Sequence, residues 1–215
     1  MIEALLGPPV ASYEMFGDVD SPDLFPQEAA SIAHAVPIRR REFATARTCA
    51  RRALGQLGYA PMPIPVGERG APQWPADVVG SITHCAGYRV AAVGRATAIR
   101  SIGIDAEPNL ALPDGVLEAV TLHAERCQVR ELLLEVPAVR WDRLVFSVKE
   151  SVYKCWYQLC HRPLEFEDVE VRFDPDRMEF TASLLVSAAA AEQLLSFTGN
   201  CIATEQYLLS GVTAA

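Results

Sequence analysis

Residues 139–159 read VRWDRLVFSVKESVYKCWYQL and predict a long amphipathic helix. Small and apolar side chains recur at spacings of three and four, which places them on one side: Leu144, Val148, Ser151, Val152 and Cys155. On the same helix Glu150 and Lys154 are four residues apart and share a face. A surface ion pair at that spacing contributes only about 0.3–0.5 kcal/mol, and it is the ordinary explanation for two such charges.

The segment also contains both lysines of the chain, Lys149 and Lys154. Lysine and arginine together number 19, and all of these residues except the two lysines are arginine. An ammonium group is compact, binds phosphate as a point charge and can release its proton. We therefore expect these lysines to have a role that arginine fills less well, with a chance pairing as the alternative.

Outward from this helix, the pattern alternates between helices and groups of short strands. The spacing of apolar residues predicts a second helix over 38–57, followed by a loop rich in proline and glycine over 58–75. One or two short helices are expected over 114–135. Six strands are predicted, over 78–83, 88–93, 99–105, 166–173, 179–185 and 201–212. The alanine-rich piece between the last two strands is ambiguous between helix and strand.

This order repeats one plan, a helix followed by three strands. Residues 1–36 add no long element, because Pro22 and Pro26 interrupt them. We therefore predict an α+β fold of two similar α+β halves, an N-terminal half over residues 1–106 and a C-terminal half over 107–215.

Length and composition limit the class of protein. With 215 residues, half of them hydrophobic, the chain can bury a core as one large domain or two small ones. No apolar run is long enough to cross a bilayer and the N-terminus lacks a basic start, so we expect a cytoplasmic protein without membrane contact. The formal net charge of −8 argues against nucleic acid as a partner. The six cysteines form no C-x-x-C pair, which argues against structural zinc and a disulfide scaffold.

Two acids end the third predicted strand, in the sequence Gly-Ile-Asp105-Ala-Glu107. Residues i and i+2 of a strand point to the same face, so these carboxylates are expected side by side. Adjacent carboxylates raise each other's pKa unless a cation lies between them, and Mg²⁺ with oxygen ligands is a common solution. Solvated acids at the end of a strand are the alternative explanation.

A hydroxyl and an imidazole lie together at the end of the first predicted strand, Gly80-Ser-Ile-Thr83-His84. The helix over 38–57 carries Arg40, Arg47 and Arg51 on a second face, with Arg39 and Arg41 at its start. Together these groups could bind an anion. A histidine used for packing, beside a solvated arginine face, is the alternative.

Taken in order, the three motifs resemble the 4′-phosphopantetheinyl transferases of the surfactin (Sfp) type. The motifs are Gly80-Ser-x-Thr-His84, Gly-Ile-Asp105-Ala-Glu107 and Phe146-Ser-x-Lys-Glu150-Ser-x-Tyr-Lys154. The sequence Arg39-Arg-Arg-Glu-Phe and the Gly-Tyr-Arg after the histidine are most similar to the actinobacterial branch of that family. The third motif, with its fixed internal spacing, is highly specific.

The resemblance implies a fold and a reaction. Two α+β halves would be related by a pseudo-twofold axis, with coenzyme A in the cleft between them. The enzyme would transfer the 4′-phosphopantetheine group of coenzyme A to a serine of an apo acyl or peptidyl carrier protein, releasing 3′,5′-ADP. It would depend on Mg²⁺, for which Mn²⁺ could substitute, and it would act as a monomer.

The resemblance also implies a role for each motif residue. Asp105, Glu107 and Glu150 match the Mg²⁺ ligands of the family. Our own hypothesis is that Glu150 also accepts the proton of the carrier serine, directly or through water. Lys154 matches a lysine that faces the phosphates, and Lys149 matches a second pyrophosphate contact. The 3′-phosphoadenosine end of coenzyme A would be held by Arg39, Arg47, Thr83 and His84.

The loop over 58–75 carries one match to the family and one departure. Arg69 falls where actinobacterial relatives keep basic residues that bind coenzyme A. At the position where a lysine is expected, a few residues earlier, this chain has Val66. How the nucleotide of coenzyme A is bound there is left open.

Two other functions would use the same residues. A phosphohydrolase acting on coenzyme A would need the same acids and lysines but would release free phosphopantetheine. A non-catalytic module could bind coenzyme A or a carrier protein with the same fold. The intact set of three acids with Lys154 favours the transferase. The sequence leaves open which carriers are modified, whether for fatty acid, polyketide, nonribosomal peptide or siderophore synthesis.

Overall fold

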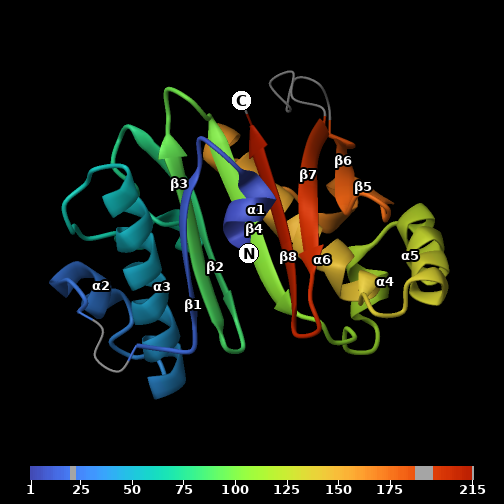
Figure 1. Ribbon diagram of the computed structural model, residues 1–215, viewed down its shortest axis with the longest axis horizontal. Helices are drawn as coiled ribbons and strands as arrows, with labels where there is room; N and C mark the ends of the chain where they lie inside the picture. Colours follow the sequence, from blue (N-terminus) through green and yellow to red (C-terminus); the bar gives the residue numbers. More distant parts are fainter. Residues whose placement is uncertain (20–22, 187–195, 215) are drawn as a thin grey trace.

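Two antiparallel sheets stand side by side, each with a long helix packed against it (Figure 1). The computed structural model describes residues 1–19, 23–186 and 196–214. The first sheet has the order β1-β3-β2, and the second has the order β4-β8-β7-β6-β5. The predicted α+β class is therefore confirmed.

The strands and helices have the following bounds. The strands are β1 (Ala11–Phe16), β2 (Val78–Cys85), β3 (Tyr88–Arg95), β4 (Ser101–Pro108), β5 (Val169–Asp174), β6 (Glu179–Leu184), β7 (Ser196–Ala203) and β8 (Tyr207–Ala214). The α-helices are α1 (Ile2–Leu6), α2 (Pro26–Ser31), α3 (Pro37–Gln56), α4 (Val116–Val120), α5 (His123–Glu135) and α6 (Trp141–Cys160). Two 3-10 turns are η1 (Glu68–Gly70) and η2 (Phe166–Asp168). None of the helices in the described ranges is long and apolar enough to span a membrane.

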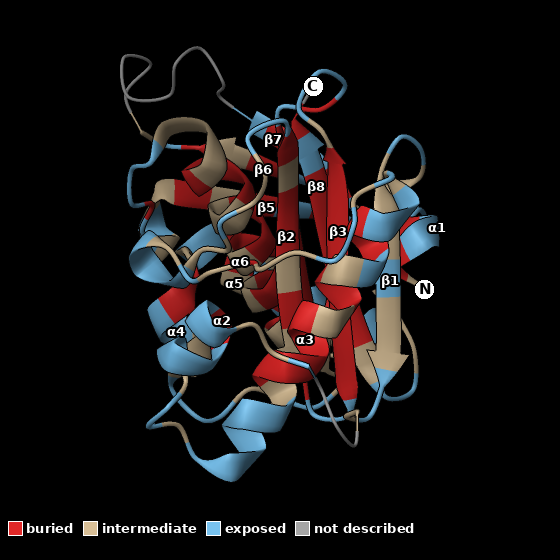
Figure 2. Cartoon of the chain, turned by 90° about the vertical axis from the view of Figure 1, so that its left-hand side faces the viewer, coloured by how far each residue is buried: buried red, intermediate tan, exposed pale blue. Residues whose placement is uncertain are grey.

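The first sheet is covered by α3, which begins at Pro37. Proline suits a first helical position because the amide hydrogen it lacks has no partner there. The helix places small side chains, Cys49, Ala50 and Ala53, against β1 and β3, so that helix and sheet approach closely. Strand β3 lies between two neighbours and is buried along nearly its whole length, whereas β1 forms a partly exposed edge (Figure 2).

The second sheet is covered by α6 on one face and by the short α1 on the other. The contact with α6 is closest at Gly103 of β4, where an added Cβ would lie 1.8 Å from the Ser151 carbonyl oxygen. On the opposite face, a Cβ at Gly211 would lie 2.7 Å from Leu5 of α1. Glycine is therefore required at Gly103 because the backbone of α6 occupies the space of a side chain.

The two sheets meet where β2 runs beside β4. The strands belong to different sheets, and side chains link them: the Ile104 amide donates to Ser81 Oγ at 3.2 Å. The residues that the sequence singled out on β2, β4 and α6 thus lie along one seam.

The structure corrects the sequence-based assignment of several strands. The edge strand β1 lies within residues 1–36, where no strand was expected. The single strand predicted over 201–212 is two strands, β7 and β8, joined by a turn. The strand predicted over 166–173 begins as the turn η2, and 187–195 of the alanine-rich piece lie outside the described residues.

The third predicted strand, β4, pairs with β8 and therefore joins the second sheet. The predicted division at residue 106 falls inside this strand. The hydrogen-bonded sheets separate earlier in the sequence, between β3 and β4.

We expect Gly103→Ala to lower the free energy of unfolding by about 3 kcal/mol or more, because overpacking usually costs about 1–3 kcal/mol and here the clash is with backbone. Gly94→Ala is the matched control, since its Cβ would meet only Ile102 and Ile99 side chains at 3.4 Å or more. Urea denaturation measures both. Equal stability of the two variants would contradict the close approach of α6 to β4.

Candidate active site

The acids Asp105 and Glu107 of β4 both reach the helix α6, as their i, i+2 spacing predicts. Asp105 pairs with Lys154 near the middle of α6, and Glu107 pairs with Arg143 near its start. Gly103 lies on the same face of β4, so the absence of a side chain there lets the helix bring its polar residues to these acids. Strand β4 and helix α6 together form the candidate site.

Asp105 is the most buried acid of the site, with 5% of its surface exposed. Its Oδ1 atom accepts hydrogen bonds from Lys154 Nζ at 2.7 Å and from Thr83 Oγ1 at 3.0 Å. Its Oδ2 atom is buried and has no hydrogen-bond partner among the described residues. Leaving a buried carboxylate oxygen without a partner costs folding free energy. This atom is therefore the best candidate ligand for a cation.

Lys154 forms its ion pair with Asp105 rather than with Glu150, the partner that helical spacing suggests. Its Nζ atom also donates to the carbonyl oxygen of Ile104 at 3.1 Å. Both bonds cross from α6 to β4, so Lys154 is not simply half of a surface i, i+4 pair.

Glu107 accepts a hydrogen bond from Arg143 at 2.7 Å. Burial raises the pKa of the Glu107 carboxyl; the bond from Arg143 opposes this rise and the charge of Asp105 adds to it. Burial likewise raises the pKa of Glu150, which Lys154 opposes and which Asp105 and Glu107 increase. The three acids therefore repel one another across β4 and α6.

These acids fit the chemistry of a divalent cation. Within the described ranges, no three His, Cys, Asp or Glu side chains are already arranged to hold a metal ion. The orphaned Asp105 Oδ2 and the mutual repulsion of the three carboxylates nevertheless call for positive charge, and hard oxygen donors suit Mg²⁺. In this structure Lys154 and Arg143 balance the charge of Asp105 and Glu107.

A cavity of about 240 Å³ adjoins Glu150 and Lys154, between η1, β2 and α6. Glu150, Lys154 and Arg69 line it, together with the aromatic rings of Trp74, Tyr153 and Tyr157. A larger cavity of about 880 Å³ lies beside α3 and β1; Arg51 of the predicted arginine face lines it, but none of the three acids and neither lysine does. The smaller cavity is the better candidate because the charged groups meet there.

His84 and Arg39 are neighbours, since the Arg39 guanidinium contacts His84 Nε2. Burial and the charge of Arg39 lower the pKa of His84, which favours the neutral imidazole. Arg47 lies about two turns further along α3, the helix of Arg39, and is buried. Its Nε donates to the Ile64 carbonyl oxygen at 2.8 Å. Burial lowers the pKa of Arg47 to about 10. The structure thus joins Arg39 with His84, while Thr83 joins the acids.

Lys149 points away from the acids. It is 2% exposed, and its Nζ atom donates to Glu125 at 2.8 Å and to the Phe166 carbonyl oxygen at 2.7 Å. Glu125 also accepts from the Val171 amide at 2.7 Å, so this buried pair ties α5 and α6 to β5. The expected contact of Lys149 with a pyrophosphate stays a prediction.

Sequence reasoning missed two charged residues, Arg143 and Glu125. Arg143 had a signal, because it lies seven residues before Glu150 and shares a polar stripe of α6 with Ser147 and Lys154. Glu125 had none, because its partner Lys149 comes 24 residues later and only the tertiary fold brings them together.

Comparison with known proteins defines the class. Residues 27–94 match the family described as 4′-phosphopantetheinyl transferase N-terminal domain, and residues 101–205 match the 4′-phosphopantetheinyl transferase superfamily. Together with the full-length relatives below, these matches show that the chain belongs to the 4′-phosphopantetheinyl transferase superfamily.

Three relatives place the chain more narrowly within that family. It is 49% identical to 4′-phosphopantetheinyl transferase Svp of Streptomyces mobaraensis, over 100% of this chain and 89% of Svp. It is 48% identical to the transferase PptT of Mycobacterium tuberculosis, over 80% of this chain and 75% of PptT. It is 42% identical to the transferase Npt of Nocardia iowensis, over the whole of both chains. The expected similarity to the actinobacterial branch is confirmed.

We expect Glu150→Gln to raise the free energy of unfolding at neutral pH in metal-free buffer. Burial raises the folded-state pKa of Glu150 above its ordinary value of 4.5, so the folded protein binds this proton more tightly than the unfolded chain does. The ionised carboxylate therefore weakens the fold above that raised pKa, and the gain in Glu150→Gln should vanish as the pH falls to about 4.5.

Chemical denaturation of both proteins across this pH range is the measurement. Glu205→Gln, which alters an exposed carboxylate in the turn between β7 and β8, serves as the control and should change little. A Glu150→Gln variant that is less stable than the parent at neutral pH would contradict the burial of this charge.

Proposed function

We propose that this chain transfers the 4′-phosphopantetheine group of coenzyme A to a serine of an apo acyl or peptidyl carrier protein, in an Mg²⁺-dependent reaction. Membership of the transferase superfamily supports the reaction class. The observation that carries the assignment of the site is the meeting of Asp105, Glu150 and Lys154 between β4 and α6, beside a cavity.

The chain's own residues account for the movement of the proton and the leaving group. Glu150 accepts the proton of the carrier serine hydroxyl, directly or through water. The serine oxygen then forms a bond to the β-phosphorus of coenzyme A, and the bond from that phosphorus to the bridging oxygen breaks. Lys154 stabilises or protonates the departing 3′,5′-ADP. Charge grows on phosphoryl oxygens in this reaction, so positioning and electrostatics supply most of the catalysis.

Asp105, Glu107 and Glu150 are the residues that would hold Mg²⁺. When bound, the ion would neutralise the pyrophosphate of coenzyme A. Asp105 Oδ2 supports this assignment, because it is buried without a partner among the described residues. Mn²⁺ accepts the same oxygen ligands and could substitute.

The remaining predicted residues are proposed to bind coenzyme A. Arg39 and His84, which contact each other, would hold the 3′-phosphoadenosine end with Arg47 and Thr83. Arg69 lines the cavity beside Glu150 and Lys154 and would act on the same ligand. A contact between Lys149 and the pyrophosphate would require its buried bond to Glu125 to open.

We further propose that the protein acts in the cytoplasm as a monomer. One chain supplies both α+β units and the seam between them, so the site needs no residue from a second copy. A coenzyme A phosphohydrolase and a non-catalytic coenzyme A or carrier-binding module remain the alternatives, and product analysis separates them.

Intact-mass analysis of a panel of apo acyl and peptidyl carrier proteins, incubated with the protein, coenzyme A and Mg²⁺, tests the proposal. We expect a gain of one phosphopantetheinyl group that is lost on adding EDTA. Free phosphopantetheine in the mixture would favour the hydrolase. Coenzyme A binding without any product would favour the binding module.

Two variants test the roles of the acids in the same assay. Glu150→Gln should abolish turnover but leave coenzyme A binding largely intact, because it removes a proton acceptor and keeps the shape of the side chain. Asp105→Ala should lose both activity and metal dependence, with Glu205→Gln as the unaffected control. Near-normal turnover of Glu150→Gln would remove Glu150 from the mechanism, and an active Asp105→Ala would put the metal elsewhere.

A further inference from the structure

The first turns of α6 are hydrogen-bonded to the end of β4 and to the segment that follows it, and Arg143 makes three of these bonds. Its guanidinium uses all three nitrogens: Nη1 donates to Glu107 Oε2 at 2.7 Å, Nε to the Leu110 carbonyl oxygen at 2.6 Å, and Nη2 to the Ala111 carbonyl oxygen at 2.8 Å. The Arg143 side chain is 16% exposed. A guanidinium fixed at three points cannot swing, so it holds the Glu107 carboxylate in one place.

The bond from Arg143 leaves one oxygen of Glu107 available. Arg143 takes Oε2, and no residue in the described ranges hydrogen-bonds Oε1. Glu107 shares its face of β4 with Asp105, whose Oδ2 is also without a partner there. Each of the two strand acids thus has one oxygen held by a cation of α6 and one oxygen free.

We propose that Arg143 is a positioning residue, which orients Glu107 so that its Oε1 atom is presented to a divalent cation shared with Asp105. The inference rests on the proposed function, because it takes Glu107 as a ligand of that cation. Groups that orient metal ligands in this way typically contribute roughly 10–100-fold to metal affinity or activity. Arg143 thereby joins the site without touching substrate.

A purely structural role for Arg143 is the competing explanation, and the neighbouring bonds separate the two. The segment after β4 has other anchors: Leu112 donates to Asp142 Oδ2 at 2.8 Å, and Asn109 Nδ2 donates to the Ala138 and Thr204 carbonyl oxygens at 2.9 and 2.7 Å. The backbone of this segment is thus also anchored at Asn109 and Leu112, on either side of the two carbonyl groups that Arg143 contacts. The Glu107 side chain has no second anchor, because the bond from Arg143 is its only hydrogen bond from the described residues.

Mn²⁺ binding gives a readout that does not depend on turnover. The free Mn²⁺ signal in electron paramagnetic resonance would be titrated with the full chain in the presence of coenzyme A. We expect Arg143→Gln to weaken Mn²⁺ binding roughly 10–100-fold. Arg143→Lys should weaken it less, because an ammonium keeps the charge but cannot make three directed bonds.

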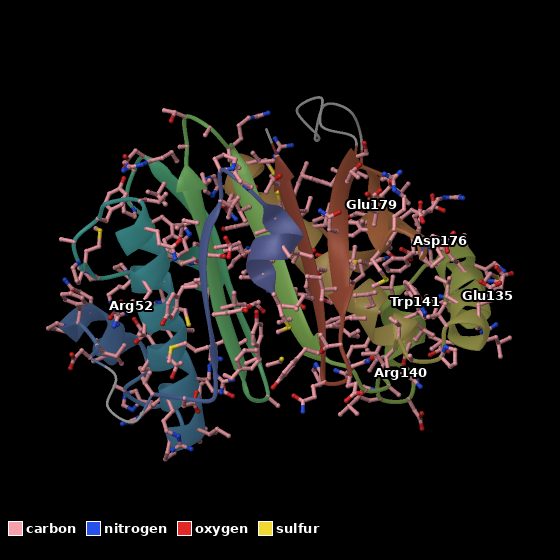
Figure 3. The ribbon with its side chains drawn as sticks, in the orientation of Figure 1. Arg52, Glu135, Arg140, Trp141, Asp176 and Glu179 are labelled. Carbon is pink, nitrogen blue, oxygen red and sulfur yellow. The ribbon has the colours of Figure 1, made fainter. Side chains whose placement is uncertain are left out.

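Arg140→Gln is the matched control. Arg140 and Trp141 lie at the start of α6 (Figure 3). The Arg140 side chain pairs with Asp142 rather than with Glu107. This variant should bind Mn²⁺ like the parent. The double variant Arg143→Gln with Glu107→Gln should bind no more weakly than Glu107→Gln alone, because Arg143 acts through Glu107.

The outcomes distinguish this inference from the proposed function. If the parent does not bind Mn²⁺, or if Glu107→Gln binds it normally, both the proposed metal site and this inference are wrong. If Glu107→Gln weakens binding and the two Arg143 variants do not, the inference alone is overturned. Additive losses in the double variant would also overturn it. Should Arg143→Gln melt below the assay temperature, Arg143→Lys and its double variant decide the matter.

Discussion

The close approach of α6 to β4 is the constraint on which the rest of the structure depends. Gly103 has no side chain, and the Ser151 carbonyl of α6 takes the space that a Cβ would fill. The helix can therefore lie flat on the strand, with its polar stripe facing the two strand acids. At this separation Lys154 and Arg143 each reach a carboxylate of β4 at 2.7 Å.

The same approach creates an electrostatic imbalance in the site. Three carboxylates share one partly buried region, and α6 supplies two cations to them. Burial, and after it the charges of the neighbouring acids, raises the pKa values of Glu107 and Glu150. A fold optimised for stability alone would not gather these acids. Such local conflict is typical of functional sites, where stability is given up for chemistry. The negative charge that the protein leaves uncompensated is the charge that a divalent cation would offset.

The sequence predicted what depends on local periodicity. Helices α3 and α6, strands β2 and β3, and the shared face of Asp105 and Glu107 follow from spacing alone. It did not predict β1, a short edge strand whose pairing with β3 depends on residues more than 70 positions later. It also missed which partner each charge takes, since Lys154 prefers Asp105 to Glu150 and Lys149 prefers Glu125. Ion pairs between distant segments cannot be predicted from the periodicity of the sequence. The family could be predicted, because it follows from the order of the three motifs.

Strand β4 forms its hydrogen-bonded ladder with β8, in a register that pairs Ser101 with Ala214. Residues 109–206 lie between the two strands in sequence. On the ribosome, the segment carrying Asp105 therefore emerges long before its pairing partner does, and contacts of such long sequence separation form slowly. The nascent chain must therefore hold this apolar strand, with its two acids, without its backbone partner until residues 207–214 have emerged. A truncation that removed only β8 would strip the backbone partner from the strand that bears the acids.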